Sequence, residues 1–277
     1  MSKAPIFVLA QAPRTGSTWV QRLLTSTGDV LIWGETSVLL YPYGDLWSYD
    51  DGENPDNPHS LKKFRKQKAR MWMAVLQPFL SDVLPAYKTM LEELYEKTAK
   101  REGFPRWGVK ETRWNEKVLD FLNEAWPDSE KVFVVRDFEK VFCSRFKASR
   151  VTQGRTRRAD ILEFCSMWTE QGELILKHQN DPHCIVVRHE DLVGRRGRQK
   201  KLCRQLELNE PDFDQCDKKI SWSPHVRKIE PNWERKKPNH LDLQARDDLE
   251  IINGSPHYAR MLEVSKAFGY EWLGEEG

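Results

Sequence analysis

Residues 6–19 read IFVLAQAPRTGSTW, and this segment sets the architecture of the chain. Its first part is a continuous apolar run, which predicts a buried strand over 6–11. Pro13 and Gly16 interrupt the run, and a Ser-Thr pair then opens an apolar-periodic segment that predicts a helix over 17–27. Such a loop directs several backbone N–H groups and a helix N-terminus to one point, which favours a bound phosphate or other oxyanion.

The loop does not match the G-x-x-x-x-G-K-[ST] pattern of nucleoside triphosphate-binding proteins. If Gly16 takes the second glycine position, Gln11 falls at the first glycine and Ser17 at the lysine. The cation of the loop is Arg14, on its N-terminal side. A later strand ends in Arg136 instead of the Asp that an Mg²⁺-dependent NTPase would place there, and arginine suits a second phosphate. These departures disfavour an ordinary ATPase or GTPase.

The rest of the chain alternates strands with helices. Strands are predicted over 6–11, 30–33, 107–110, 131–136 and 184–189. Helices are predicted over 17–27, about 60–80, 82–101, 115–126, 138–150, 157–180, 197–206, 241–252 and 257–267. This order predicts an α/β fold, a P-loop-like doubly wound parallel sheet flanked by helices and carrying helical insertions. We expect one domain, 1–277, with ligands at the carboxyl ends of its strands.

Residues 13–19 resemble the 5′-phosphosulfate loop of sulfotransferases that use 3′-phosphoadenosine 5′-phosphosulfate (PAPS), in which Lys or Arg precedes a [ST]-G-[ST]-[ST] run. The second signature of that family is a strand that ends in Arg, with a Ser eight residues later. Arg136 and Ser144 match it in this chain. The resemblance implies an enzyme that moves the sulfuryl group of PAPS to a hydroxyl, or an amine, of a small metabolite or natural product. No metal is needed, because the sulfuryl group carries a single negative charge.

The resemblance also implies a set of nucleotide-binding residues. The 5′-phosphate would be held by the loop and the first turn of its helix, the 3′-phosphate by the second signature, and the adenine by an aromatic residue after the loop. These residues are Arg14, Thr15, Gly16, Ser17, Thr18, Trp19, Arg136, Ser144 and, at a later strand end, His189. Simple helix N-capping by Ser17 and Thr18, core packing by Trp19 and a structural role for His189 are the alternatives.

The catalytic residues follow from two further strand ends. Lys110 resembles the family's lysine that stabilises the departing phosphate. In cytosolic members a His two residues later is the base, but Thr112 holds that position here. Tyrosyl-protein and several bacterial types instead use a Glu on the loop after the second strand, which makes Glu35 the first candidate base and Glu111 the second. Either carboxylate needs a pKa raised by burial to work as a base near neutral pH.

Composition limits the partners. The 277 residues carry 44 basic and 42 acidic side chains, a net charge of +2, so the chain has no basic field for nucleic acid. The five cysteines are odd in number and lack C-x-x-C spacing, which argues against both a disulfide framework and a zinc site. Without an apolar run of about 18 residues, we expect a cytoplasmic protein with no membrane segment.

Three features stay open at this stage. The family's C-terminal Arg-Lys-Gly motif is absent, and Arg227-Lys228 or Lys236-Lys237 could only substitute for it. The dimerisation motif of cytosolic members is also absent, so the sequence sets no oligomeric state. A degenerate P-loop kinase that uses ATP·Mg²⁺ and a non-catalytic nucleotide-binding protein of the same fold are the alternative functions.

Overall fold

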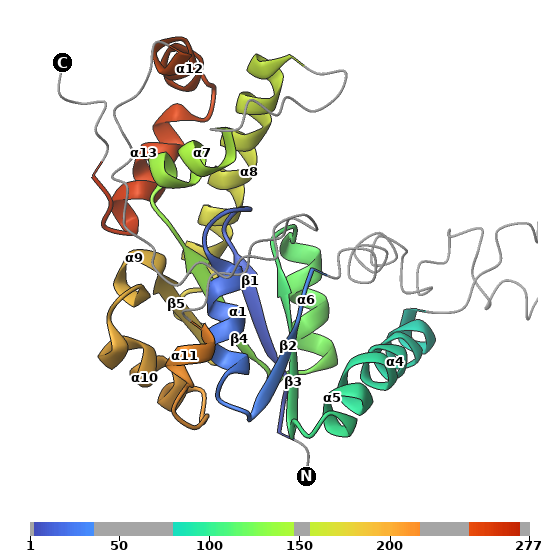
Figure 1. Cartoon of the computed structure of the whole chain (residues 1–277). Helices are drawn as coiled ribbons and strands as arrows, with labels where there is room; N and C mark the ends of the chain where they lie inside the picture. The colour runs from blue at the N-terminus through green and yellow to red at the C-terminus, as the bar shows by residue number, and fades with distance from the viewer. Residues whose placement is uncertain (1–2, 36–79, 147–155, 217–243, 272–277) are drawn as a thin grey trace, which may run out of the picture.

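The computed structural model describes residues 3–35, 80–146, 156–216 and 244–271. Five strands form one sheet at the centre of the molecule, in the order β2-β3-β1-β4-β5, and all neighbouring strands are parallel (Figure 1). The strands are β1 (Ile6–Ala10), β2 (Val30–Trp33), β3 (Arg106–Glu111), β4 (Glu130–Val135) and β5 (Cys184–Arg188). Each boundary lies within one residue of its predicted position, so the parallel α/β sheet is confirmed.

The helices connect the strands and close the fold at the C-terminal side. They are α1 (Ser17–Thr25), α4 (Leu80–Leu91), η2 (Glu92–Glu96), α5 (Lys97–Arg101), α6 (Glu116–Ala125), α7 (Phe138–Phe146), α8 (Arg157–His178), α9 (His189–Leu192), α10 (Arg196–Gln205), α11 (Phe213–Cys216), α12 (Gln244–Asn253) and α13 (Tyr258–Ala267). The helix predicted over 82–101 is a helical segment with a π-helical turn, η2, in its middle. The short helices α9 and α11 were not predicted. Of the helix predicted at about 60–80, only residue 80, the first residue of α4, lies within the described residues. The end of the helix predicted over 138–150 also lies outside them, because the described segment stops at residue 146.

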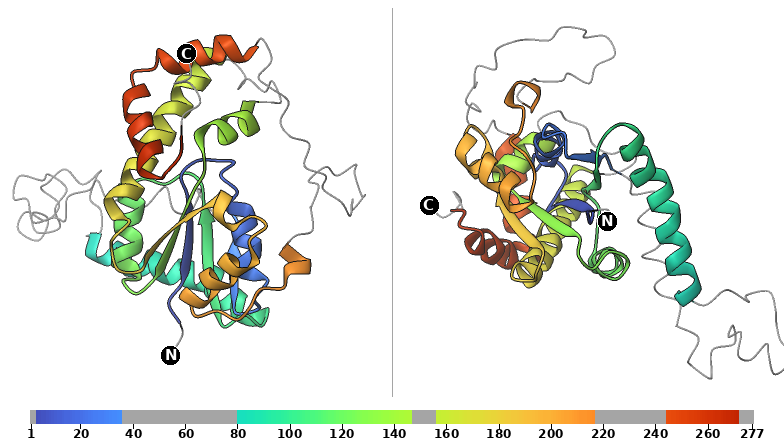
Figure 2. Two further views of the ribbon diagram at one scale, coloured as in Figure 1. Left: turned by 90° about the vertical axis from the view of Figure 1, so that its left-hand side faces the viewer. Right: turned by 90° about the horizontal axis from the view of Figure 1, so that it is seen from below.

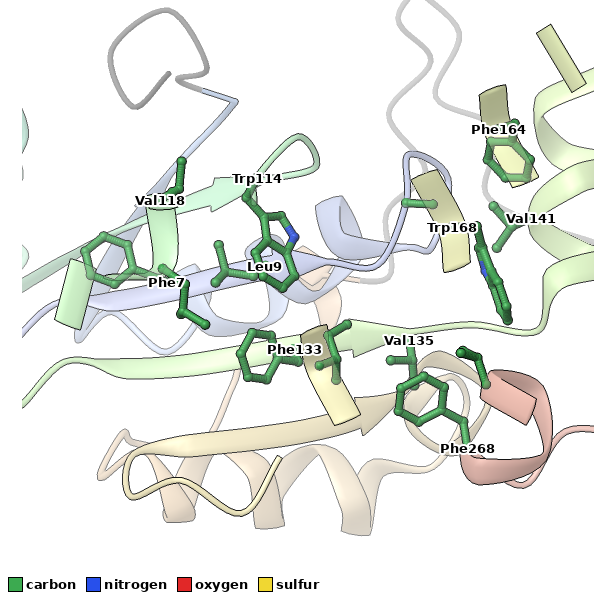
Figure 3. Packing of buried hydrophobic residues seen from close by; sticks show 14 of the residues in the cluster. Phe7, Leu9, Trp114, Val118, Phe133, Val135, Val141, Phe164, Trp168 and Phe268 are labelled. Carbon is green, nitrogen blue, oxygen red and sulfur yellow. The ribbon is translucent and has the colours of Figure 1, made fainter. Parts of the chain in front are cut away.

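Two hydrophobic cores cover the two faces of the sheet. Because side chains alternate along a strand, Phe7 and Leu9 of β1 enter one core, while Ile6 and Val8 enter the other. The first core packs against α6, α7, α8 and α13, and Figure 3 shows its aromatic side chains close together. The second core packs against α1 and α10, and Figure 2 shows these helices on the opposite side of the sheet.

The strand order places the functional loops together. From β1 the chain goes out to β2, returns to β3 beside β1, and then passes β1 to reach β4 on its other side. The connection that leaves β1 therefore runs toward the β2 edge of the sheet, whereas the connection that leaves β3 runs toward the β5 edge. A parallel sheet with such a reversal has a crevice at the carboxyl ends of the strands, and ligands bind there.

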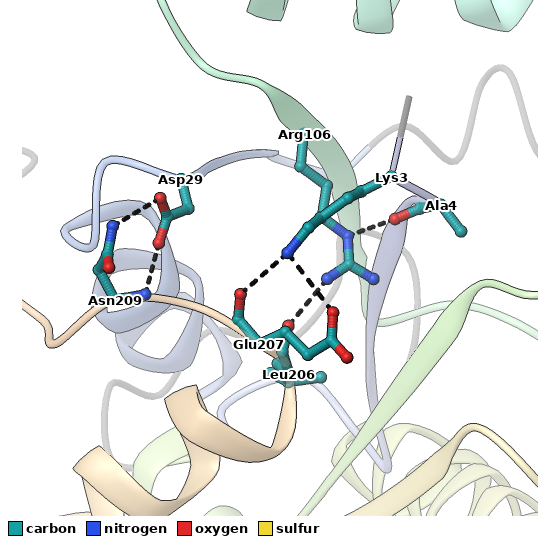
Figure 4. Close-up of polar contacts among 7 residues, drawn as sticks. All are labelled: Lys3, Ala4, Asp29, Arg106, Leu206, Glu207 and Asn209. Carbon is teal, nitrogen blue, oxygen red and sulfur yellow. Dashed lines mark hydrogen bonds and ion pairs between the residues drawn. The ribbon is translucent and has the colours of Figure 1, made fainter. Parts of the chain in front are cut away.

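At the amino ends of the strands, opposite the crevice, a buried arginine connects neighbouring segments of the chain (Figure 4). Arg106, 6% exposed, donates hydrogen bonds to the carbonyl oxygens of Ala4 and Leu206 and so joins β3 to segments before β1 and after α10. Burial lowers the pKa of the guanidinium, but arginine remains charged at neutral pH. Lys3 also lies at this end of the sheet and contacts Glu207 at 3.4 Å, but both side chains are exposed.

Replacing Arg106 by Met should lower the free energy of unfolding by about 2–4 kcal/mol, because two backbone carbonyls lose a charged donor while the aliphatic stem is kept. Urea denaturation measures this change. Lys3→Ala is the control, and we expect a change within about 0.5 kcal/mol because exposed ion pairs contribute little. Equal losses in the two variants would contradict the role of Arg106.

All five cysteines lie in the described segments, and each is a free thiol. None of the helices in the described ranges has the length and apolar character needed to cross a membrane.

Candidate active site

The loop between β1 and α1 has an unusual backbone. Arg14 and Gly16 both have positive φ values, 79° and 91°, and the buried hydroxyl of Thr15 donates to the carbonyl oxygen of Ala12 at 2.9 Å. The N-cap of α1 is Gly16, and no side chain caps the helix. The N-capping interpretation of Ser17 and its neighbour is therefore wrong. The first N–H groups of α1 have no intrahelical acceptor and are available to an anion.

The side chains that follow the loop differ in exposure. Ser17 is buried, whereas Thr18 is exposed and Arg14 projects from the loop as an exposed cation. Trp19 is partly buried and packs against the core beneath α1. The hydroxyl of Thr18 and the guanidinium of Arg14 are thus the groups of this motif that solvent, and hence a ligand, can reach.

The two motifs that we expect to bind anions contact each other. Arg136 follows β4 and donates from Nη1 to the backbone oxygen of Arg14 at 2.9 Å, although the two residues are 122 positions apart. Ser144 lies on α7, and its Oγ accepts a hydrogen bond from Nε of Arg14 at 3.2 Å. The structure therefore joins Arg14, Arg136 and Ser144 into one cluster at the carboxyl end of β1 and β4.

His189 lies against this loop. It begins α9 directly after β5, and its ring covers Gly16 so closely that a Cβ at Gly16 would lie 2.1 Å from Cδ2 of the imidazole. Burial, and after it the charge of Arg136, lowers the pKa of His189 to about 4. The imidazole is neutral at physiological pH and can act as a hydrogen-bonding group beside the loop.

Glu190 and Tyr270 belong to the site but were not singled out from the sequence. Oε1 of Glu190 lies 3.9 Å from Nε of Arg136 and 3.6 Å from Nζ of Lys140. The hydroxyl of Tyr270 donates to Oε2 of the same carboxylate at 2.9 Å, and burial raises the Tyr270 pKa. Glu190 follows His189 at a strand end, a position that could have been considered, whereas nothing in the sequence near Tyr270 indicates its contact.

Lys110 and Glu35 form an ion pair at the ends of β3 and β2. Nζ of Lys110 lies 2.5 Å from Oε1 of Glu35, and the two side chains are 5% and 50% exposed. Lys110 is in register with Val8, so its side chain is on the α1 side of the sheet. The burial that we required of a Glu35 base is not found, because half of this side chain faces solvent.

Glu111 points the other way. It is in register with Leu9 and fully buried on the α6 and α8 side of the sheet. Its Oε1 accepts hydrogen bonds from the backbone N–H groups of Thr112 and Arg113, at 2.8 and 3.1 Å. The two adjacent candidates Lys110 and Glu111 thus lie on opposite faces, and the contacts of Glu111 stabilise the turn after β3.

A pocket of about 560 Å³ lies on the Glu111 side, next to the phosphate loop. Its walls come from Pro13, the turn after β3, α7 and α8; they are Pro13, Arg113, Trp114, Asn115, Arg145, Glu163, Phe164, Ser166, Met167, Glu170, Gln171 and Leu174. Nε2 of buried Gln171 donates to the Trp114 carbonyl at 3.0 Å, while its Oε1 is buried without a partner among the described residues. The lining of the pocket therefore combines apolar side chains with two arginines and two glutamates.

The described part of the chain contains no group of three or more His, Cys, Asp or Glu side chains that could hold a metal ion. Arg227-Lys228 and Lys236-Lys237, the possible substitutes for the C-terminal motif, lie outside the described residues.

The model of the sulfotransferase family matches residues 5–212, which include every site residue named so far except Tyr270. The fold is similar to the sulfotransferase domain of an olefin synthase from Synechococcus PCC 7002, with a TM-score of 0.55, 15% identity, and coverage of 97% of this chain and 95% of that one. It is also similar to the sulfotransferase domain of the curacin biosynthetic pathway, with a TM-score of 0.51, 15% identity, and coverage of 97% and 98%. No curated protein gives a significant sequence match.

Proposed function

Because the chain belongs to the sulfotransferase family, we propose that it transfers the sulfuryl group of PAPS to a hydroxyl of a small acceptor. The observation that carries the donor assignment is the contact of Arg14 with both Arg136 and Ser144. Two arginines that converge from separate strand ends give one site for a ligand with two phosphate groups. A nucleotide phosphorylated at both 5′ and 3′ positions has this character.

In this proposal the loop holds the 5′-phosphate. Arg14, the first N–H groups of α1 and the Thr18 hydroxyl offer donors where charge builds on the leaving phosphate. By analogy with phosphoryl transfer, the transition state is loose and in-line, so positioning and charge stabilisation supply most of the catalysis. Arg136 and Ser144 bind the 3′-phosphate, while His189 and Trp19 are the candidates for contact with the rest of the nucleotide.

Glu35 is the proposed base and Lys110 the proposed catalytic cation. The two are in contact on the α1 side of the sheet, where the phosphate loop enters its helix. Glu35 is half exposed and can receive a proton from an incoming acceptor, whereas Glu111 is fully buried and accepts two backbone hydrogen bonds. Access to an incoming acceptor therefore favours Glu35, whereas, of the two, the burial expected of a base is found only at Glu111.

The pocket beside Pro13 lies on the Glu111 side of the sheet, so we place the skeleton of the acceptor there and its reacting hydroxyl over the carboxyl ends of the strands, where Glu35 also lies. Trp114, Phe164, Met167 and Leu174 in the pocket lining can contact a hydrocarbon or aromatic skeleton, and charged side chains of the same lining can bind polar groups of the acceptor. Met167→Trp should fill the pocket and raise the KM for the acceptor by about 10-fold or more, with the affinity for the nucleotide unchanged. Steady-state kinetics with a turnover substrate measure the change. An unchanged KM would place the acceptor elsewhere.

The protein should bind 3′-phosphoadenosine 5′-phosphate (PAP) more tightly than AMP by one to several powers of ten, because each charged contact to the 3′-phosphate contributes about 1.5–3 kcal/mol. Titration calorimetry with PAP, AMP and ATP·Mg²⁺ measures the three affinities. Arg136→Ala should remove most of the preference for PAP over AMP.

Arg260→Ala is the control for this experiment, since it removes one positive charge from the surface pair with Glu173, away from the loop. It should leave all three affinities unchanged. Equal binding of PAP and AMP would remove Arg136 and Ser144 from the proposed site. Preferential binding of ATP·Mg²⁺ would favour the kinase alternative, and PAP binding without turnover on metabolite mixtures would favour a non-catalytic nucleotide-binding protein.

A further inference from the structure

Arg136 and Glu190 carry two buried polar atoms that make no hydrogen bond within the described segments, although Oε1 of Glu190 is within ion-pair distance of Arg136 and, at 3.6 Å, of Nζ of Lys140. Nε of Arg136 and Oε1 of Glu190 have no hydrogen-bond partner among the residues that the structure describes. They face each other at 3.9 Å, which is within ion-pair distance but beyond hydrogen-bond distance. Buried donors and acceptors are nearly always satisfied in folded proteins, so a facing pair of unsatisfied atoms calls for an explanation.

The geometry of guanidinium supplies one. Its donors are arranged in a rigid plane, so that the Nε edge and the Nη atoms can serve different partners. In Arg136 the Nε edge faces Glu190, while Nη1 donates to the backbone of Arg14 in the phosphate loop. A shift of about 1 Å would close the Nε–Oε1 hydrogen bond. The Nη side would then be held toward an anion at the loop.

Glu190 is itself held from another part of the chain. Tyr270 follows α13, is 8% exposed, and donates its hydroxyl proton to Oε2 of Glu190 at 2.9 Å. The guanidinium of Arg188 lies over the Tyr270 ring, 4.5 Å from its centroid. Tyr270 lies beyond the segment that the family model matches, so this chain adds a C-terminal contact to the site.

We infer that Glu190 is a positioning residue, which holds the Nη side of Arg136 toward the 3′-phosphate of the nucleotide, and that Tyr270 fixes Glu190 in this orientation. The inference rests on the proposed function, because it assumes that Arg136 binds a 3′-phosphate. Glu190 does not touch the nucleotide. Its effect is therefore limited to ligands that Arg136 contacts, and AMP, which lacks the 3′-phosphate, is the reference ligand.

Calorimetry on the full chain tests this role. Glu190→Ala should raise the Kd for PAP by about 10-fold to 100-fold and change the Kd for AMP by less than about 2-fold, as one charge-assisted contact is lost. Glu190→Gln should recover most of the affinity for PAP, because its amide oxygen can still accept from Nε. Tyr270→Phe should raise the Kd for PAP alone, by about 3-fold to 10-fold, since Glu190 keeps its charge but loses the hydroxyl donor that orients it.

A double-mutant cycle separates positioning from general stability. In the Arg136→Ala background, Glu190→Ala should have no further effect on PAP binding. Glu210→Ala, which removes a carboxylate from an exposed ion pair with Lys200, is the matched control and should change neither Kd.

Three results would overturn the inference, and they are distinguishable. If Glu190→Ala weakens PAP and AMP equally, Glu190 is only structural. If the same variant binds PAP more tightly, Glu190 competes with the phosphate for Arg136. In both cases wild-type discrimination and its loss in Arg136→Ala would leave the proposed function intact. If the wild type binds PAP and AMP equally, the 3′-phosphate role of Arg136 and the inference fail together.

Discussion

Glu35→Gln is expected to lower kcat by about 10²–10⁴ while the affinity for PAP stays nearly unchanged. The amide keeps the volume of the side chain and can still accept a hydrogen bond from Lys110, but it cannot take a proton from the acceptor. Pre-steady-state and steady-state turnover with a hydroxyl acceptor, together with calorimetry for PAP, give the two quantities. The pH–rate profile should also lose its ascending limb, because that limb reports the ionisation of the base.

Glu111→Gln is the matched control. Its amide oxygen can still accept from the N–H groups of Thr112 and Arg113, so the turn after β3 should persist and turnover should remain near that of the wild type. An inactive Glu111→Gln beside a normal Glu35→Gln would assign the base to the end of β3. Activity in both variants would indicate an acceptor that needs no base from the protein, such as an amine.

Lys110 provides an independent measure of the same pair. Lys110→Ala should lower kcat and weaken nucleotide binding, because this cation is proposed to stabilise the leaving phosphate as well as to contact Glu35. If Glu35→Gln lowers kcat but its pH–rate profile keeps the ascending limb, the loss would instead come from a displaced Lys110. The two variants therefore separate proton transfer from charge stabilisation.

Gly16→Ala is expected to raise the Kd for PAP by about 10²-fold or more and to reduce folding stability. A φ of 91° costs an L-residue about 1–3 kcal/mol, and the new Cβ would lie 2.1 Å from Cδ2 of His189, so that the imidazole must move. Both effects distort the loop that offers its N–H groups to the 5′-phosphate. Calorimetry for PAP and urea denaturation measure the two losses.

Gly28→Ala is the control that separates the cost of a positive φ from the cost of the clash with His189. Gly28 has a similar φ of 78°, but a Cβ there would meet no atom within 4 Å. This variant should lose about 1–2 kcal/mol of stability and keep its affinity for PAP within about 2-fold. Adding His189→Ala to Gly16→Ala should recover part of the affinity, since it removes the collision but not the backbone strain. An unaffected Gly16→Ala protein would show that the loop does not bind the phosphate through its backbone.

Local patterns in the sequence carried much of the fold and part of the site. All five strands were located to within one residue, several of them as continuous apolar runs, because a parallel strand buried on both faces is rich in apolar residues. Arg14, Arg136 and Lys110 were identified because they lie in short motifs that resemble those of the family and that follow or end predicted strands, where parallel sheets place ligands. These features depend on neighbours along the chain and are therefore encoded locally.

The tertiary structure decided which of these residues meet. The sequence does not state that β1 lies between β3 and β4, yet this order brings Arg14 against Arg136 and Ser144 across 122 and 130 positions. Strand alternation then separated Lys110 from Glu111, leaving Glu35 beside the lysine. Tyr270 follows α13, which packs on α8, and from there it contacts Glu190 at the end of β5. Such contacts depend on how distant elements pack together, and no short segment contains that information.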